Sequence, residues 1–567
     1  MSASSSSPSP SSPLLKTTNS DSGRDGDGAQ LLALGHKPEL KRNHTKLSML
    51  GLAFAILNSW TALSATLSIA LPSGGPSAVL WGLAISGLCN ICLSASLAEF
   101  LSAWPTAGGQ YHWVAEISPE EWVPLLSWIC GWINCTGWVL LVATGGSLGG
   151  QVIGGLVGLM HPDYEVSNLE TFWMYSAFTI ASFLINAFGN RVLPLFTKSA
   201  FLWSISGLAI ISATLLIATS EYQPAGFVFK KFVNETGWPD GVAWLMGFLQ
   251  GALALTGYDA VAHMIEEIPN PTKEGPILMV YAVMIGMATG FAFLTVLLFC
   301  MGDIQDVISA TEGPLLSIFY HATRNKALSA CLTIFPLGCL LFASTTLMTT
   351  SSRILYAFAR DNGLPFSAIF ATIHPTLQVP LNSLLLTTIP VLVLGSLYLI
   401  STTALNAIFS TAVISLTLSY GFPVLINVLT GRRRLPDDRD FKLPGIMGWV
   451  CNLVGLGFAC GCTVLFILPP QLPVTRENMN YSFLVFLIIV GISTLAYNFG
   501  GKGVFTGPVT ESHHRHHPVA QGAAEADAEG GWRPGMAILA YDVEEEDEEG
   551  EGEEESAVTV CRRDVRR

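Results

Sequence analysis

Residues 251–269 read GALALTGYDAVAHMIEEIP, and this stretch carries the richest set of ionisable side chains inside any apolar run of the chain. Asp259, His263 and Glu267 recur every four residues, so on a helix they form one polar stripe. Charged groups are costly in lipid and are functional candidates by default. Gly257 marks a point where such a helix can open. The alternative is that His263, Glu266 and Glu267 mark only the solvent-exposed end of a span, and that Asp259 lies one helical turn deeper in the membrane.

A second polar interruption lies in the first apolar stretch, where residues 58–64 read NSWTALS between apolar flanks. An asparagine in the middle of a span normally needs a partner, and hydrogen bonding between helices is the structural alternative. Breaks in the first and sixth spans are the pattern of inverted-repeat transporters, which hold substrate at the midplane between broken helices. The sequence therefore predicts a binding site at these two breaks.

Composition places the rest of the chain in lipid. Half of the 567 residues are apolar and 12% are charged, about half the charged fraction of a soluble protein. Stretches of about 20 apolar residues are long enough to span a bilayer as helices. Twelve stretches qualify: 47–72, 77–103, 124–158, 170–189, 192–219, 241–263, 276–301, 328–352, 380–400, 402–430, 448–470 and 480–499. We expect an all-α polytopic membrane protein with twelve transmembrane helices.

The domain organisation follows from the same pattern. Residues 1–46 and 501–567 lack apolar periodicity, so we expect disordered tails on either side of a transporter domain at 47–500. The second tail is acidic, with the run EEEDEE at 544–549, and is a solvated segment or a docking site for a cytosolic regulatory partner. The chain lacks the basic patch that nucleic-acid binding requires.

Loop charges predict the orientation. Fourteen lysine and arginine residues, Arg432, Arg433 and Arg434 among them, fall in loops on one side of a twelve-span topology, against five on the other. The positive-inside rule then places both termini in the cytosol. Asn234-Glu235-Thr236 is a glycosylation sequon in the longest loop on the opposite side.

The third predicted span is rich in glycine at a spacing of four, as at Gly145/Gly149 and Gly146/Gly150. Small faces of this kind let helices approach closely. The chain contains no Walker A, HExxH or serine-elbow sequence. We therefore expect no enzymatic activity, no cofactor and no metal.

In these motifs the chain resembles the amino acid–polyamine–organocation (APC) superfamily, and within it the fungal amino acid/choline subgroup that includes GABA permeases and choline permeases. The resemblance spans residues 47 to about 505. The matching pieces are Asn58-Ser59-Trp60, Ser73 to Pro76, Ser96 to Glu99, Pro105 to Gln110, Asn234 to Trp238, Gly257-Tyr258-Asp259, His263 to Glu267, Ala357 to Pro365, Val379 to Ser383 and Asn478 to Tyr481.

The resemblance implies two inverted five-helix repeats plus two extra helices, and uptake of small nitrogenous solutes without ATP. The substrate contacts that it implies are Asn58, Ser59, Trp60, Thr61, Thr256, Gly257, Tyr258 and Asp259. Ala62 stands where many relatives have glycine, which gives the first break less backbone freedom.

The leading hypothesis is a secondary transporter for amino acids or GABA, coupled to protons through Asp259, His263 and Glu267. Half-helix N-termini would bind the substrate carboxylate, while carbonyl ends and Asp259 would receive the amine. A permease for choline, another quaternary amine or a polyamine is the alternative, with Trp60 and Tyr258 as cation–π surface. A nutrient sensor without appreciable flux is a third. We expect residence in the plasma membrane, with the vacuole or another internal membrane as the alternative.

Overall fold

The computed structural model describes residues 51, 57–189, 193–399, 403–475 and 478–508. These residues are helical, apart from connecting segments and one isolated β-bridge between Ser73 and Asn234. The all-α prediction is therefore confirmed for the part of the chain that the structure describes. Residues 1–46 and 509–567 lie outside it, so the two disordered tails stay predictions.

The folded part continues a little beyond residue 500. Phe505 is buried, with its ring centroid 5.3 Å from that of Trp128 and 5.7 Å from that of Phe358. A single large aromatic residue in a polar segment gives no periodic signal, which is why the sequence pattern does not show this boundary.

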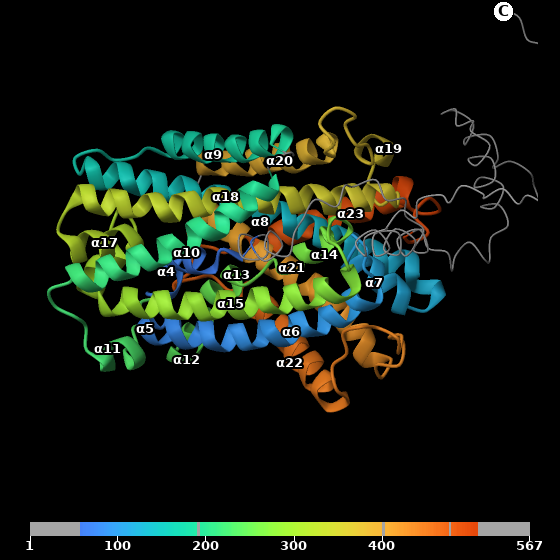
Figure 1. The fold of residues 1–567 in the computed structure, drawn as a ribbon, viewed down its shortest axis with the longest axis horizontal. Helices are drawn as coiled ribbons and strands as arrows, with labels where there is room; N and C mark the ends of the chain where they lie inside the picture. Colours follow the sequence, from blue (N-terminus) through green and yellow to red (C-terminus); the bar gives the residue numbers. More distant parts are fainter. Residues whose placement is uncertain (1–50, 52–56, 190–192, 400–402, 476–477, 509–567) are drawn as a thin grey trace, which may run out of the picture. The chain divides into compact units, whose positions relative to one another are not determined.

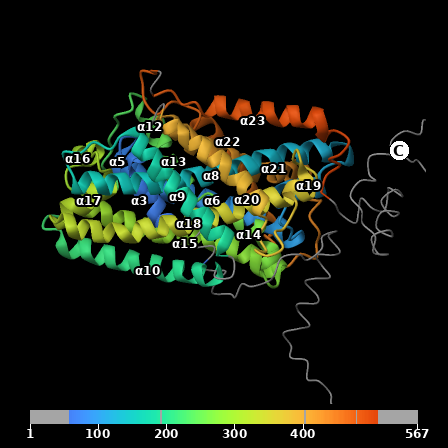
Figure 2. The same cartoon turned by 90° about the horizontal axis from the view of Figure 1, so that it is seen from above.

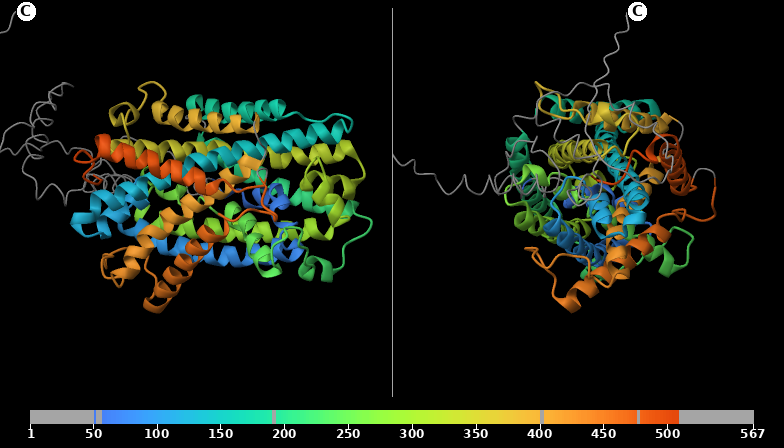
Figure 3. Two further views of the ribbon diagram at one scale, coloured as in Figure 1. Left: turned by 180° about the vertical axis from the view of Figure 1, so that it is seen from behind. Right: turned by 90° about the vertical axis from the view of Figure 1, so that its right-hand side faces the viewer.

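Ten helical segments within the described residues are long and apolar enough to cross a membrane. They are built on α6 (Leu83–Ala103), α8 (Val123–Met160), α9 (Asn168–Phe188), α10 (Leu193–Ala218), α15 (Pro271–Phe299), α18 (Lys326–Arg360), α20 (Leu381–Gly395), α21 (Thr403–Leu429), α22 (Gly445–Leu465) and α23 (Ser482–Ala496). Figure 1 shows most of these helices running side by side. α21 is central, since 67% of its most apolar window is buried, against 6% for α23. Figures 2 and 3 accordingly place α23 and α10 on opposite edges of the helix bundle.

Two of the twelve predicted spans are not among these ten. The described residues of 47–72 include α3 (Ser59–Ala65) and α4 (Leu67–Ala70). The stretch 241–263 is divided into α12 (Asp240–Met246), α13 (Phe248–Ala254) and α14 (Ala260–His263). The helices of 241–263 are too short to count as one continuous span, because the stretch is broken at its predicted polar interruption. Residues 47–50 and 52–56 of the first stretch lie outside the described residues. The count of twelve stays a prediction.

The glycine-rich face of α8 packs as predicted. A Cβ atom on Gly149 would lie 2.6 Å from the ring of Phe178, and one on Gly150 would lie 3.1 Å from the backbone nitrogen of Tyr175. Both partners belong to α9. Larger side chains would therefore force α8 and α9 apart.

The helical segment Gly75–Ala103 separates the two ends of the bundle. Its 29 residues extend over about 44 Å, more than the roughly 30 Å of a hydrocarbon layer. Beyond its first residue, Ser73 bridges to Asn234. Near its last residue, the buried carboxylate of Glu99 accepts hydrogen bonds from Arg432 at 2.7 Å and Arg439 at 2.8 Å.

We call these the Asn234 end and the Arg432 end. The arginine-rich loop and the sequon loop thus lie at opposite ends, as the loop charges predict. The arginines also have a structural role, because they neutralise a buried acid.

Cysteine labelling tests which end faces the cytosol. Glu235 and Arg433 are exposed, one at each end. If the positive-inside rule holds, a membrane-impermeant maleimide will label Glu235→Cys in intact cells and Arg433→Cys only after permeabilisation. The wild-type chain corrects for native thiols, and the opposite pattern would reverse the orientation.

Candidate functional site

The sixth predicted span opens where the sequence indicates. α13 ends at Ala254, α14 begins at Ala260, and the residues between them are not helical. Gly257 has φ of +102°, a conformation that residues with a Cβ atom rarely adopt. Asp259 directly precedes α14, and its carbonyl accepts from the backbone N–H of Ala262 and of His263. The glycine therefore permits a sharp change of direction just before the acid.

The first predicted span is interrupted at Asn58, which has φ of 38° and precedes the first residue of α3. Asn58 Nδ2, Ser59 Oγ and Thr61 Oγ1 are all buried, and none has a hydrogen-bond partner among the described residues. Buried polar groups normally have partners. Three unpartnered donors within four residues indicate a place for a polar ligand or for water.

The carboxylate of Asp259 is fully buried and accepts hydrogen bonds from several elements. Oδ2 accepts from Gln110 Nε2 at 2.8 Å and from Trp138 Nε1 at 3.1 Å, and Oδ1 accepts from Tyr420 at 2.5 Å. These donors come from α7 (Gln110–Ile117), α8 and α21. His263 Nε2 is the fourth neighbour, 3.1 Å from Oδ2. A buried carboxylate is expensive unless it is satisfied in this way.

His263 has both ring nitrogens next to acceptors. Nδ1 lies 2.9 Å from the backbone oxygen of Ala107 and therefore carries a proton, while Nε2 faces Asp259. A Cβ atom on Gly109, which has φ of +58°, would lie 2.9 Å from the His263 ring. Glycine at 109 thus lets the 105–110 segment reach the histidine.

The predicted stripe is only partly formed. Asp259 and His263 are together, but the chain tightens into a 3-10 turn at Ile265–Glu267 (η4), and a 3-10 turn does not keep the angular spacing of an α-helix. Glu267 instead pairs with Arg353 of α18 at 2.9 Å, and Glu266 pairs with Arg360 of α18 at 3.1 Å.

The other predicted contact residues are separated. Trp60 donates from Nε1 to Ser204 Oγ at 2.7 Å and meets Phe293 edge-on at 4.8 Å. Tyr258 lies in a different apolar cluster and packs on Tyr420 at 5.0 Å. The two aromatic rings therefore do not form one cation–π surface. The Thr256 hydroxyl donates to Ala252 O at 2.7 Å.

Four residues of the network are absent from the predicted set: Gln110, Asn134, Trp138 and Tyr420. Asn134 donates to Gln110 Oε1 at 2.7 Å and lies 3.4 Å from His263 Nε2. A mid-span asparagine is a signal that the sequence does offer. Trp138 and Tyr420 resemble any other aromatic residue of an apolar helix. The sequence pattern therefore does not predict that they donate hydrogen bonds to Asp259.

Asn234 is half-buried in the folded chain. Its Nδ2 donates to Trp238 O at 2.8 Å and to Asp240 Oδ1 at 2.9 Å, and its Oδ1 accepts from the Thr236 hydroxyl at 2.7 Å. Modification at Asn234 would have to precede formation of these bonds. Glycosylation there stays a prediction.

Comparison with known proteins identifies the class. Residues 47–492 match the family model described as amino acid permease. A provisionally named amino acid/polyamine transporter of Macrophomina phaseolina is 36% identical, over 76% of this chain and 96% of the relative. The choline transporter of Saccharomyces cerevisiae is 32% identical over 85% of each chain, and amino-acid permease 2 of Neurospora crassa is 30% identical over 89% and 93%.

The chain belongs to the amino acid permease family. It is an integral, multi-pass membrane protein and a member of the APC superfamily, as the sequence motifs indicate.

The charges of Glu267 and Arg353 should be coupled in their effect on stability. Removal of one partner from a buried ion pair typically costs about 3–5 kcal/mol, because the other charge stays buried. We expect Arg353→Met to lower the thermal stability of the detergent-solubilised protein, and Glu267→Gln combined with Arg353→Met to recover part of the loss. Arg433→Gln, an exposed arginine at the same end, is the control. A double variant no more stable than Arg353→Met would show that the two charges are not coupled.

Proposed function

We propose that this protein is a secondary active permease that moves amino acids or GABA-like solutes by alternating access, with protons as the coupling ion. The observation that carries the proposal is the buried Asp259–His263 pair at the break of the sixth span, with its two polar atoms 3.1 Å apart. A proton-binding pair at the break would connect protonation directly to the shape of the binding site.

Substrate recognition is assigned to the two breaks. The unpartnered groups of Asn58, Ser59 and Thr61 can all donate hydrogen bonds, which suits a carboxylate. The C-terminal carbonyls of α13 suit an amine, since the end of a helix carries partial negative charge. The Tyr258 hydroxyl is also without a partner among the described residues and adds a further polar group.

Asp259 is better suited to the proton than to the amine. Its oxygens already contact four protein groups, so a substrate ammonium would compete with bonds that the fold makes. Loss of the shared proton would set the lone pair of His263 Nε2 against a buried carboxylate that has hydrogen bonds but no cationic partner, which is costly. Opening of the Arg432 end would admit water to that charge, so proton release and opening would favour each other.

Glu266 and Glu267 are assigned to closure of the Arg432 end. Both pair with arginines of α18, and Glu266 also accepts from the backbone N–H of Ala107 at 3.3 Å. Glu267 thus serves the coupling cycle as a gate residue in this proposal, rather than as a relay partner of His263.

A choline-type permease is the second candidate, because the yeast relative at 32% identity is named a choline transporter. The donors at the first break that have no partner among the described residues favour the amino acid, since choline has no carboxylate. Polyamine transport and solute sensing without flux have less support from the site. A plasma-membrane location, cytosolic termini and a partner for the acidic tail complete the proposal and rest on the sequence alone.

Substitution of the pair tests the coupling. In Asp259→Asn, the amide oxygen can accept from Gln110 and Trp138 while its nitrogen donates to Tyr420, so the fold is retained. The shared proton is lost, and uptake should fall toward equal inside and outside concentrations, without dependence on the pH gradient. His263→Gln should show the same loss of gradient-driven uptake.

Accumulation of radiolabelled GABA is measured with and without a proton uncoupler, normalised to surface protein. Glu165→Gln, an exposed carboxylate at the other end of the bundle, is the matched control. Full gradient-driven accumulation in both pair variants would refute the coupling role.

Competition separates the two substrate classes. If the donors at the first break bind a carboxylate, excess unlabelled GABA will inhibit uptake of a labelled amino acid, while choline at the same concentration will not. Thr61→Val removes one donor with little change of shape and should raise the KM for the amino acid by about tenfold, which corresponds to one lost hydrogen bond to a charged group. Stronger inhibition by choline, with an unchanged KM in Thr61→Val, would favour the choline permease.

A further inference from the structure

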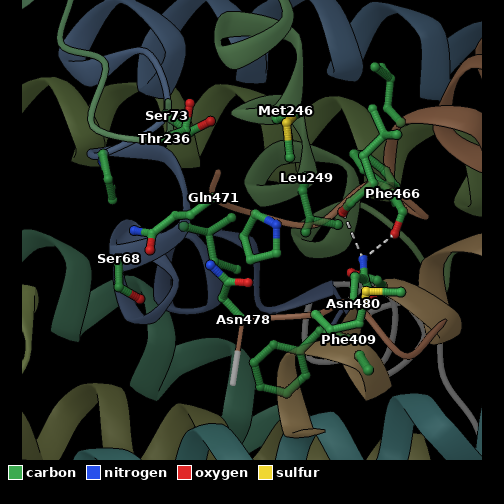
Figure 4. A pocket seen from close by; sticks show the side chains of 18 residues that line it. Ser68, Ser73, Thr236, Met246, Leu249, Phe409, Phe466, Gln471, Asn478 and Asn480 are labelled. Carbon is green, nitrogen blue, oxygen red and sulfur yellow. Dashed lines mark hydrogen bonds between the residues drawn. The ribbon is translucent and has the colours of Figure 1, made fainter. Parts of the chain in front are cut away.

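The two broken spans approach each other toward the Asn234 end. There, α4 contributes Ser68 to the lining of a cavity of about 300 Å³, and α13 contributes Leu249 (Figure 4). The lining residues that the structure describes include neither Asn58 nor any residue of 255–259. The cavity is therefore not part of either break, and the distance between the breaks depends on other contacts.

Gly286 of α15 contacts both breaks. A Cβ atom on this glycine would lie 2.3 Å from Ser59 Oγ and 3.3 Å from Leu255 Cδ2. Ser59 directly follows Asn58, and Leu255 directly follows α13. Both side chains are buried. Because a packed interior has no room for an extra methyl group, glycine at 286 lets the two breaks approach the same point of α15.

A hydrogen bond also connects the two spans directly. The buried amide of Gln250 in α13 donates from Nε2 to the backbone oxygen of Leu63 in α3 at 2.6 Å. One turn beyond Gly286 on α15, a Cβ atom on Gly290 would lie 2.3 Å from Leu63 Cδ1. α3 is therefore packed closely on α15 and bonded to α13, so Ser59 keeps a defined separation from the C-terminal end of α13.

This separation has a chemical meaning in the proposed site. The donors at the first break are assigned to the substrate carboxylate, and the C-terminal carbonyls of α13 are assigned to its amine. One carbon atom lies between the amine and the carboxyl group of an α-amino acid, and three lie between them in GABA. The distance between the two breaks therefore has to match the spacing of the two charges in the substrate.

We infer that Gly286 is a specificity-determining residue, which sets the distance between the carboxylate donors and the amine acceptors by placing Ser59 and Leu255 against α15. The inference rests on the proposed function and adds to it the substrate property that the site distinguishes, the separation of amine and carboxylate. A methyl group at 286 must displace the Ser59 hydroxyl, because the two would lie only 2.3 Å apart. A short substrate cannot follow that displacement, whereas GABA can adapt by rotation about its chain bonds.

Gly286→Ala tests the assignment through the KM values for radiolabelled alanine and radiolabelled GABA. The variant should raise the KM for alanine by about tenfold, as expected for one lost hydrogen bond to a charged group, and the KM for GABA by less. Gly290→Ala is the matched control, since it adds the same methyl group one turn away, against the flexible end of Leu63. It should leave the ratio of the two KM values unchanged.

Ser59→Gly shows whether Gly286 acts through Ser59. This variant removes the hydroxyl that the new methyl group would meet, so Gly286→Ala should raise the KM for alanine no further in the Ser59→Gly background. If Gly286→Ala does not reach the membrane, Gln250→Leu releases the same separation from the side of α13 and should also affect alanine more than GABA.

An equal change for both solutes in Gly286→Ala, or the same further rise in the Ser59→Gly background, would overturn the assignment. If the wild-type chain takes up only one of the two solutes, the comparison in the Ser59→Gly background decides with that solute. Absence of uptake of both solutes by the wild-type chain would instead count against the proposed function.

Discussion

The structure depends on one constraint: a helix that breaks inside a membrane must satisfy its polar groups from within the protein. At the break before α14, this requirement is met by side chains and backbone from distant parts of the chain. Gln110, Trp138 and Tyr420 hold the Asp259 carboxylate, and His263 faces it from the next turn. These contacts connect α7, α8, α14 and α21. The position of the break therefore depends on how these helices pack against one another.

The two breaks meet this constraint differently. At the sixth span, the acid is satisfied by four neighbours. At the first span, the side chains of Asn58, Ser59 and Thr61 remain without partners among the described residues. In the proposed coupled permease, this asymmetry divides the tasks: the satisfied acid suits an internal switch, and the donors without partners among the described residues suit an incoming ligand. The amino acid permease family, to which the chain belongs, is consistent with both tasks.

The ends of the bundle also differ in chemistry. The Arg432 end holds buried ion pairs, including two arginines on the carboxylate of Glu99. At the Asn234 end, the described side chains that line a cavity are uncharged. A buried ion pair contributes little net stability. Its two charges are nevertheless strongly coupled, because removal of one leaves the other buried without a counter-charge, which is costly. Such pairs are therefore suited to a closure that must hold in one state and separate in another.

Local patterns in the sequence are sufficient to predict much of this structure. Apolar length predicts the membrane helices, Gly257 and the polar run at 58–64 predict where two of them break, and glycine spacing predicts the close contact of α8 with α9. The pairing of Asp259 with His263 also follows from a spacing of four residues. These features depend on residues near one another in the chain, so the periodicity of a helix is enough to reveal them.

Tertiary structure decides the rest. Glu267 leaves the predicted stripe because η4 is a 3-10 turn, and its partner Arg353 lies 86 residues away. Tyr420 reaches Asp259 from 161 residues away, and nothing in its local sequence distinguishes it from an ordinary packed aromatic residue. The sequence alone therefore determined that this is a polytopic membrane protein and where its helices open, because those properties are local. Its class as a permease follows from its resemblance to the family. Which side chains meet at the openings depends on long-range packing, and only the folded chain decides it.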